Sequence, residues 1–177
     1  YDNNSSRALN NYVAGNMEYE KLYFESAENL LKEAIRIDNK FYEAYMILGE
    51  MMSKLRRFPE AVEYYRKAVK IDSLFYRPVF SSLANAEMMC GKYDDALIHL
   101  NVYIVQPGIS EKNKKIALKN IEVCKFAAEA IKKPVPFVPV NLGDSVNTTN
   151  DEYWPSITVD GKTLIFTREE ETGRANS

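Results

Sequence analysis

The side chains that most often carry catalysis or bind metals are few in this chain. His99 is its one histidine, and Cys90 and Cys124 are its two cysteines. The sequence has no Cys-x-x-Cys pair and no Cys/His spacing of the kind that holds structural zinc. A single histidine leaves little from which to build a catalytic triad, and no Gly-rich phosphate-binding motif occurs. We therefore expect no catalytic residue, no metal site, no cofactor and no enzymatic activity.

Structural roles remain for these residues. Cys90 and Cys124 could pair in an oxidising compartment, but free cysteine is among the most often buried residue types, so we favour two buried, unpaired thiols. His99 is predicted to lie on a helix beside Leu100, where it packs or faces solvent. The carboxylates have the spacing of helix surfaces. We therefore expect the protein to function through a binding surface.

The composition indicates a globular chain without a strong electrostatic bias. It is 46% hydrophobic and 27% charged, with a formal net charge of -2, so its overall charge gives no reason to expect nucleic acid or an anionic membrane as a partner. No apolar run reaches the ~20 residues that span a bilayer. The first residue is Tyr1 and not Met, and we expect the natural N-terminus to lie upstream.

An internal repeat organises the first hundred residues. The segment LLKEAIRIDNKF (30–41) recurs as YYRKAVKIDSLF (64–75), with Ala34 aligned on Ala68, a step of 34 residues. A weaker third copy follows as GKYDDALIHLNVYIVQP (91–107). A fixed period of this length with helical apolar spacing is typical of stacked helix pairs.

The repeat resembles the tetratricopeptide-repeat family. The second repeat fits that pattern best, with Tyr45, Leu48, Gly49, Phe58, Ala61, Tyr65 and Ala68. The third has Phe80, Leu83, Ala84, Gly91, Tyr93, Ala96 and Leu100, and the first has Gly15, Phe24, Ala27, Leu31 and Ala34. The first repeat departs from the pattern, because Asn11 stands where an aromatic residue is expected. The resemblance implies an all-α, right-handed solenoid of three helix pairs.

The predicted helices follow from this pattern. They cover residues 6–21, 24–37, 41–55, 59–71, 76–90 and 93–106. Ser110 is placed to cap a seventh helix at 111–132, whose apolar residues fall on one stripe. Its lysine-rich opposite face is suited to solvent, so we expect this helix to cover the end of the solenoid. A lysine patch for an anionic partner is the alternative.

The composition changes after residue 133. The segment PVPFVPV (134–140) is too rich in proline for a helix and is predicted to be extended, as the start of a linker over 134–150. Two strand-like runs then flank Asp160-Gly161, which is a strong hairpin signal. A lone hairpin is marginal in water, so we expect further strands to pack against it.

The hairpin segment is similar to the first repeat of β-propellers related to those of TolB and the WD type. The matching residues are Trp154, Pro155, Ser156, Asp160, Gly161, Lys162, Leu164 and Phe166. This resemblance divides the chain into a tetratricopeptide-repeat domain with its capping helix at 1–133, a linker at 134–150 and the incomplete start of a propeller at 151–177. The chain is then expected to stop inside its second domain.

Repeats, linker and propeller motif in this order resemble OmpA-family envelope proteins of bacteria with type IX secretion. The resemblance implies a periplasmic scaffold, anchored to the outer membrane as a lipoprotein, that reaches peptidoglycan only through a C-terminal domain absent from this sequence. Two alternatives stay open. One is the accessory, substrate-gating half of a propeller-containing peptidase, and the other is a cytosolic peptide-binding adaptor. In each case the resemblance implies no nucleic-acid partner.

The resemblance also implies where a partner binds. In this repeat class the first helix of each pair lines a concave groove that holds an extended peptide or a partner helix. The groove positions carried over are Tyr12, Asn16, Tyr19, Met46, Glu50, Lys54, Ser81, Asn85, Met88 and Met89. Few of these are basic, which argues against a clamp for a peptide's terminal carboxylate. Methionine and tyrosine favour an apolar or adaptable protein segment, and we expect one of Met88 and Met89 to pack inward.

Overall fold

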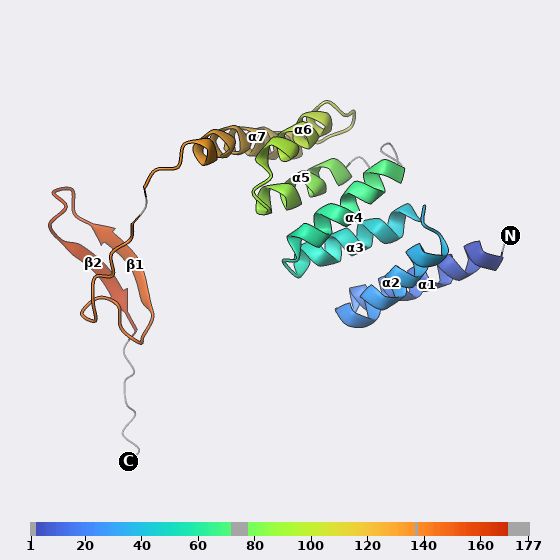
Figure 1. Cartoon of the computed structure of the whole chain (residues 1–177), viewed down its shortest axis with the longest axis horizontal. Helices are drawn as coiled ribbons and strands as arrows, with labels where there is room; N and C mark the ends of the chain where they lie inside the picture. Colours follow the sequence, from blue (N-terminus) through green and yellow to red (C-terminus); the bar gives the residue numbers. More distant parts are fainter. Residues whose placement is uncertain (1–2, 72–77, 137, 170–177) are drawn as a thin grey trace, which may run out of the picture. The chain divides into compact units, whose positions relative to one another are not determined.

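The computed structural model of the chain describes residues 3–71, 78–136 and 138–169. The chain divides into two compact units, Tyr1–Pro134 and Val135–Ser177. The first unit is helical, and the second contains a pair of strands (Figure 1).

The helical unit contains the seven predicted helices. They are α1 (Asn3–Glu20), α2 (Phe24–Ile37), α3 (Tyr42–Lys54), α4 (Phe58–Ile71), α5 (Val79–Met89), α6 (Tyr93–Ile104) and α7 (Glu111–Lys132). Their ends agree with the sequence prediction to within one helical turn. Positions 76 and 77, predicted to begin the fifth helix, lie outside the described residues. Among the helices that the structure describes, none is long and apolar enough to cross a membrane.

The helices pack as consecutive antiparallel pairs, which Figure 1 shows as α1 with α2, α3 with α4, and α5 with α6. Small residues allow each pair to approach closely. A Cβ atom added at Gly15 would lie 2.8 Å from Cγ of Leu31, and one added at Gly49 would lie 2.6 Å from Cε1 of Tyr65. In the third pair Ala84 takes the equivalent position and is fully buried. The missing aromatic at Asn11 therefore does not prevent α1 from pairing with α2.

The turn inside each pair repeats one backbone geometry. Leu22, Arg56 and Gly91 follow α1, α3 and α5 with φ values of +64°, +59° and +71°. After each of them a backbone N–H reaches back to a carbonyl five residues earlier, as from Arg57 to Met52 at 2.8 Å. This is the Schellman cap, which satisfies carbonyl groups at a helix end. The first two caps place a non-glycine residue in the left-handed region.

The stack ends at α7, which packs against α6. The Ser110 hydroxyl accepts a hydrogen bond from the Asn113 N–H at 3.2 Å, which confirms the predicted cap. The buried residues of α7 are Ala117, Ile121, Cys124 and Ala128, all on the predicted stripe. Cys124 and the half-buried Cys90 both carry free thiols.

The second unit holds β1 (Glu152–Ile157) and β2 (Leu164–Arg168), which pair antiparallel. The register shifts between Tyr153 and Ser156, where Trp154 has a φ of +51°. Apolar side chains of this sheet lie open to solvent, with Trp154 83% exposed. Two strands form a hairpin and do not establish a propeller, so the propeller stays a prediction. Its positions 170–177 fall outside the described residues.

Candidate functional site

The first helix of each pair, together with α7, forms a surface that we call the inner groove. Contacts join these helices from one repeat to the next. The Tyr12 ring on α1 meets Phe41, at the start of α3, edge-on with ring centroids 5.0 Å apart. On α7 the Asn120 side-chain amide donates a hydrogen bond to Asn85 of α5 at 3.2 Å. Residues from distant parts of the sequence therefore lie along one face.

At one end of the groove Lys54 covers Tyr19. The Lys54 Nζ atom lies 4.3 Å from the centroid of the Tyr19 ring and 3.5 Å from a Glu50 carboxylate oxygen. Burial raises the pKa of Tyr19, and Glu50 raises it further, while Lys54 lowers it. The adjacent Tyr19 side chain is the main reason that the pKa of Lys54 is raised. Lys54 is thus already engaged by two neighbours before any partner binds.

Two further residues of α1 lie beside this contact. Tyr12 is half-buried, and its pKa is raised by burial and then by the nearby Glu43 carboxylate. Asn16 donates a hydrogen bond to Glu20 at 3.2 Å. The third predicted apolar residue in this half, Met46, is half-buried against the core. This half of the groove therefore presents aromatic edges, an amide and carboxylates.

The centre of the groove holds a pocket between α3 and α5, with a volume of about 180 Å³. It is lined by Ser53, Phe58, Tyr65, Ser82, Asn85, Ala86 and Met89. Burial raises the pKa of Tyr65 to about 12, so its hydroxyl stays protonated at neutral pH. The pocket combines an aromatic wall, a methionine and several neutral hydrogen-bonding groups. Such a lining suits an apolar side chain flanked by a peptide backbone.

Neighbouring methionines on α5 have different roles. Met89 is 57% exposed and lines the central pocket, whereas Met88 is half-buried and packs against the core. This confirms the prediction that one of the two faces inward. Met89 is the one that a partner can reach.

Beyond Asn85 the groove continues to α7 through a second pocket, with a volume of about 250 Å³. Its lining residues are Pro78, Ser81, Ser82, Tyr103, Asn113 and Ile116. Ser81 was predicted for the groove and lies here. The exposed apolar residues Ile116 and Val123 extend this surface along α7. The capping helix is therefore also part of the groove.

Carboxylates outnumber ammonium groups in the half of the groove formed by α1 and α3. Glu20, Glu43 and Glu50 lie there, and Lys54 pairs with Glu50 alone among them. Because Lys54 is held by Glu50 and Tyr19, the groove offers little positive charge to an acidic segment. That the groove is not a carboxylate clamp stays a prediction.

Sequence reasoning missed most of the residues that line the two groove pockets, including the large side chains of Tyr65, Phe58 and Ile116. Tyr65 was assigned only to packing within its repeat, yet it forms the wall of the central pocket. Phe58 begins α4, and Ile116 belongs to the capping helix, so neither fell on a first helix of a pair. A usable signal was Gly49, because a glycine on α3 lets the helix pack closely against the Tyr65 ring and so places that ring at the α3–α4 contact.

The one histidine takes part in a structural network. Glu87 is fully buried, and its two oxygens lie 2.7 Å from Nη2 of Arg66 and 2.7 Å from Nδ1 of His99. Arg66 also pairs with Asp95 at 2.5 Å. These contacts link α4, α5 and α6 around a buried carboxylate. Among the residues with described positions, no cluster of histidine, cysteine and carboxylate side chains could hold a metal ion.

The comparison that identifies the fold concerns the second helix pair. Residues 42–74 match the tetratricopeptide repeat family model. The helical unit has the tetratricopeptide-repeat fold. No curated protein matched the sequence.

Solved structures agree on this fold. The N-terminal domain of the stress-induced protein STI-1 from C. elegans superposes with a TM-score of 0.60 at 18% identity, covering 71% of this chain and 99% of that one. The first tetratricopeptide-repeat domain of Spaghetti (RPAP3), bound to the HSP90 peptide SRMEEVD, superposes with a TM-score of 0.60 at 17% sequence identity. The match covers 71% of this chain and 95% of that one. The Yersinia enterocolitica type III secretion chaperone SycD, in complex with a peptide of the translocator YopD, superposes with a TM-score of 0.57 at 14% sequence identity. The match covers 67% of this chain and 92% of that one.

Proposed function

We propose that the chain is a non-enzymatic interaction scaffold that binds an extended segment of a partner protein in the inner groove. The central pocket carries this proposal, because it opens on the groove and is lined by Tyr65 and by the half-exposed Met89. Two of the similar structures hold peptides, which supports a binding role for this fold. Aromatic and methionine side chains are common at the energetic centre of such interfaces.

The chemistry of the groove restricts the partner. The peptide bound by the Spaghetti domain, SRMEEVD, is rich in carboxylates. A segment of that kind would meet Glu43 and Glu50 here, with Lys54 already engaged. We therefore infer a neutral or basic segment with an apolar side chain for the central pocket. Neutral donors and acceptors such as Asn85 and Ser82 would bind its backbone.

Photo-crosslinking tests this proposal. A photoreactive amino acid at Asn85 reports on the groove, and the same amino acid at Ile98, an exposed residue of α6, is the matched control. We expect Asn85 to capture one specific protein in an extract of the producing cells and Ile98 not to capture it. Identical capture at both positions, or capture at Ile98 alone, would place the binding surface elsewhere.

For the cellular role, we infer an envelope scaffold of the OmpA-family type, associated with type IX secretion and followed by a propeller. The propeller motif around Asp160-Gly161 supports this, as do the open faces of the hairpin, where Trp154 and Ile157 are 83% and 65% exposed. A two-stranded sheet with uncovered apolar side chains gains stability from further strands. This role includes a lipid anchor at the outer membrane and a separate peptidoglycan-binding domain.

Two other roles fit the same groove. A cytosolic peptide-binding adaptor is equally compatible with the tetratricopeptide-repeat fold, and a gating half of a peptidase is compatible with a propeller. Cell fractionation distinguishes the envelope scaffold from the cytosolic adaptor, since the scaffold sediments with outer membranes and the adaptor remains in the cytosol. The complete coding sequence distinguishes the envelope scaffold from the peptidase half. An OmpA-like domain downstream favours the scaffold, and a Gly-x-Ser-x-Gly nucleophile elbow favours the peptidase.

A further inference from the structure

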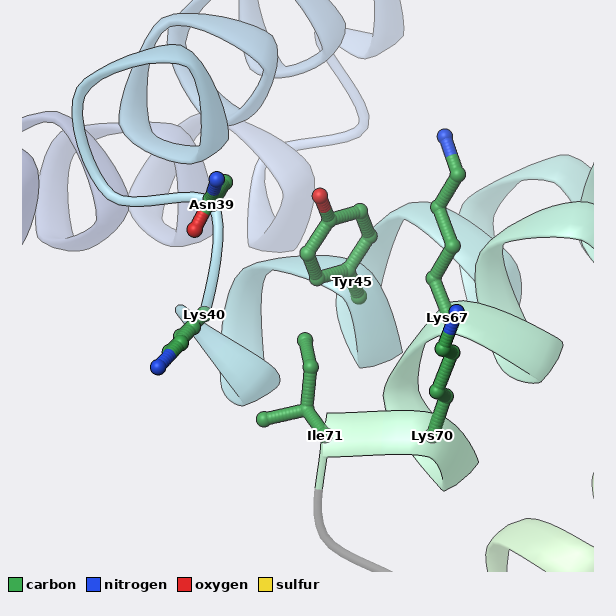
Figure 2. A pocket seen from close by; sticks show the side chains of 6 residues that line it. All are labelled: Asn39, Lys40, Tyr45, Lys67, Lys70 and Ile71. Carbon is green, nitrogen blue, oxygen red and sulfur yellow. The ribbon is translucent and has the colours of Figure 1, made fainter.

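A third pocket, which we call the lysine pocket, lies outside the inner groove, between the α2–α3 connection and the end of α4. Its volume is about 630 Å³, within the usual range for sites of small ligands. It is lined by Asn39, Lys40, Tyr45, Lys67, Lys70 and Ile71. Figure 2 shows Asn39 and Lys40 on one side and Lys67 and Lys70 on the other, with Tyr45 and Ile71 between them. It shares no lining residue with the two groove pockets.

All charged residues that line the lysine pocket are positively charged. No carboxylate is among its lining residues, and its three lysines form no ion pair with any residue in the described ranges. Elsewhere in the same unit, Lys32 pairs with Glu28 at 2.6 Å and Lys54 with Glu50 at 3.5 Å. Among the described residues, the ammonium groups of this pocket therefore have no carboxylate partner.

Nearby groups do not fully account for these lysines. Asp38 lies two residues before Lys40, and its carboxylate accepts a hydrogen bond from the backbone N–H of Lys40 at 2.9 Å. Lys70 lies in the last turn of α4, where a cation offsets the helix dipole. Lys67 lies 5.8 Å from the centroid of the Tyr45 ring, a long cation–π contact. The dipole gives a structural reason for Lys70, and none for placing Lys40 across the pocket.

The lining chemistry points to phosphate more than to carboxylate. A phosphate monoester carries nearly two negative charges at neutral pH, so two neighbouring ammonium groups attract it more strongly than a singly charged carboxylate, and lysine is a common phosphate ligand. No arginine lines the pocket. The Asn39 amide and the Tyr45 hydroxyl add neutral donors, and Ile71 with the Tyr45 ring gives an apolar floor. We propose that this pocket binds a small phosphate monoester, with its phosphate held by Lys67 and Lys70 and its organic part over Tyr45 and Ile71.

Calorimetric titration of the full chain tests this, with phenyl phosphate as the probe. Benzoate presents the same ring with a carboxylate, and inorganic phosphate lacks the ring. We expect saturable binding in the order phenyl phosphate, inorganic phosphate, benzoate. The double variant Lys67→Gln/Lys70→Gln should weaken phenyl phosphate binding at least about ten-fold, since each lost charge-assisted contact contributes up to that factor. Both lysines are exposed, so the fold should be retained.

A matched control distinguishes specific binding in the lysine pocket from nonspecific attraction to surface lysines. Lys115→Gln/Lys119→Gln removes two exposed lysines of α7, which line none of the three pockets, and should change binding less than two-fold. Tyr45→Phe leaves the charge unchanged and should weaken binding several-fold through its hydroxyl. Equal weakening by both lysine pairs, benzoate binding as tight as phenyl phosphate, or no saturable binding would each overturn the proposal. None of these outcomes bears on the inner groove.

Discussion

Lys54 of α3 lies over the ring of Tyr19 on α1, with Nζ 4.3 Å from the ring centroid, and so joins the first two repeats at the edge of the inner groove. An exposed cation–π contact contributes about 0.5–1 kcal/mol. We expect Lys54→Ala to lower the free energy of unfolding by that amount in urea titrations. Lys67→Ala, whose Nζ is 5.8 Å from the Tyr45 ring, is the control and should change it less. Equal changes in the two variants would show that the Lys54 contact has no special role.

The approach of α3 to α4 depends on Gly49. A Cβ there would lie 2.6 Å from the Tyr65 ring, which also forms the wall of the central pocket. We expect Gly49→Ala to destabilise the unit by about 1–3 kcal/mol through overpacking, despite the better helix propensity of alanine. The control is Ala84→Gly, at the equivalent site in the third pair, where a loss of about 1–2 kcal/mol reflects helix propensity and the lost burial of one methyl group, without overpacking. A stabilising Gly49→Ala would show that Tyr65 moves away without loss.

The helix caps allow a stabilising change. Leu22 has a φ of +64° and a 63% exposed side chain, so it occupies the left-handed region without a packing contribution that compensates. We expect Leu22→Gly to raise the free energy of unfolding by about 0.5–1 kcal/mol, because glycine has no Cβ strain there. Gly91→Ala, with a φ of +71° in the third cap, should lower it by a similar amount. Thermal unfolding would show opposite shifts in Tm, and shifts of the same sign would contradict this explanation.

The buried carboxylate of Glu87 depends on Arg66. Arg66→Met leaves Glu87 with His99 as its remaining ionic partner, so we expect a loss of about 2–3 kcal/mol, below the ~3–5 kcal/mol of a fully buried pair because Arg66 is 45% exposed. Adding Glu87→Gln to Arg66→Met should recover part of that loss. Asp95→Asn removes only the exposed partner and should change stability by less than about 1 kcal/mol. A double variant no more stable than Arg66→Met alone would argue against an isolated buried charge as the cause.

Acid sensitivity is expected from Glu28, which links α2 to Arg57 in the turn between α3 and α4. Burial would raise the pKa of Glu28, but hydrogen bonds from Lys32 and Arg57 outweigh burial and lower it below 4.5. Because the folded-state pKa is the lower one, this stabilisation is present above pH 4.5 and is lost as the pH falls through the folded-state value. The stability difference between the wild type and Glu28→Gln should therefore shrink below pH 4.5. A difference that is constant with pH would contradict the linkage.

Much of the helical unit was predictable because its signals are local and repeated. The 34-residue step between Ala34 and Ala68 fixes the helix pairs, and Ser110 marks the start of α7. The groove was less predictable, since its central pocket forms where side chains of α3, α4 and α5 meet. That meeting depends on how three helices pack together, and the sequence of one helix does not specify it. The lysine pocket likewise combines a connection and a helix end that lie in different repeats.

The most direct test of the inner groove is the affinity of the full chain for the protein captured through Asn85. Met89→Arg places a charge at the central pocket, and Ile98→Arg places one on α6, at residues that are 57% and 62% exposed. We predict that Met89→Arg weakens binding at least about ten-fold, as expected for a residue at the centre of an interface, while Ile98→Arg changes it less than two-fold. Equal affinities of wild type and Met89→Arg, with both folded by circular dichroism, would contradict a partner site in the groove.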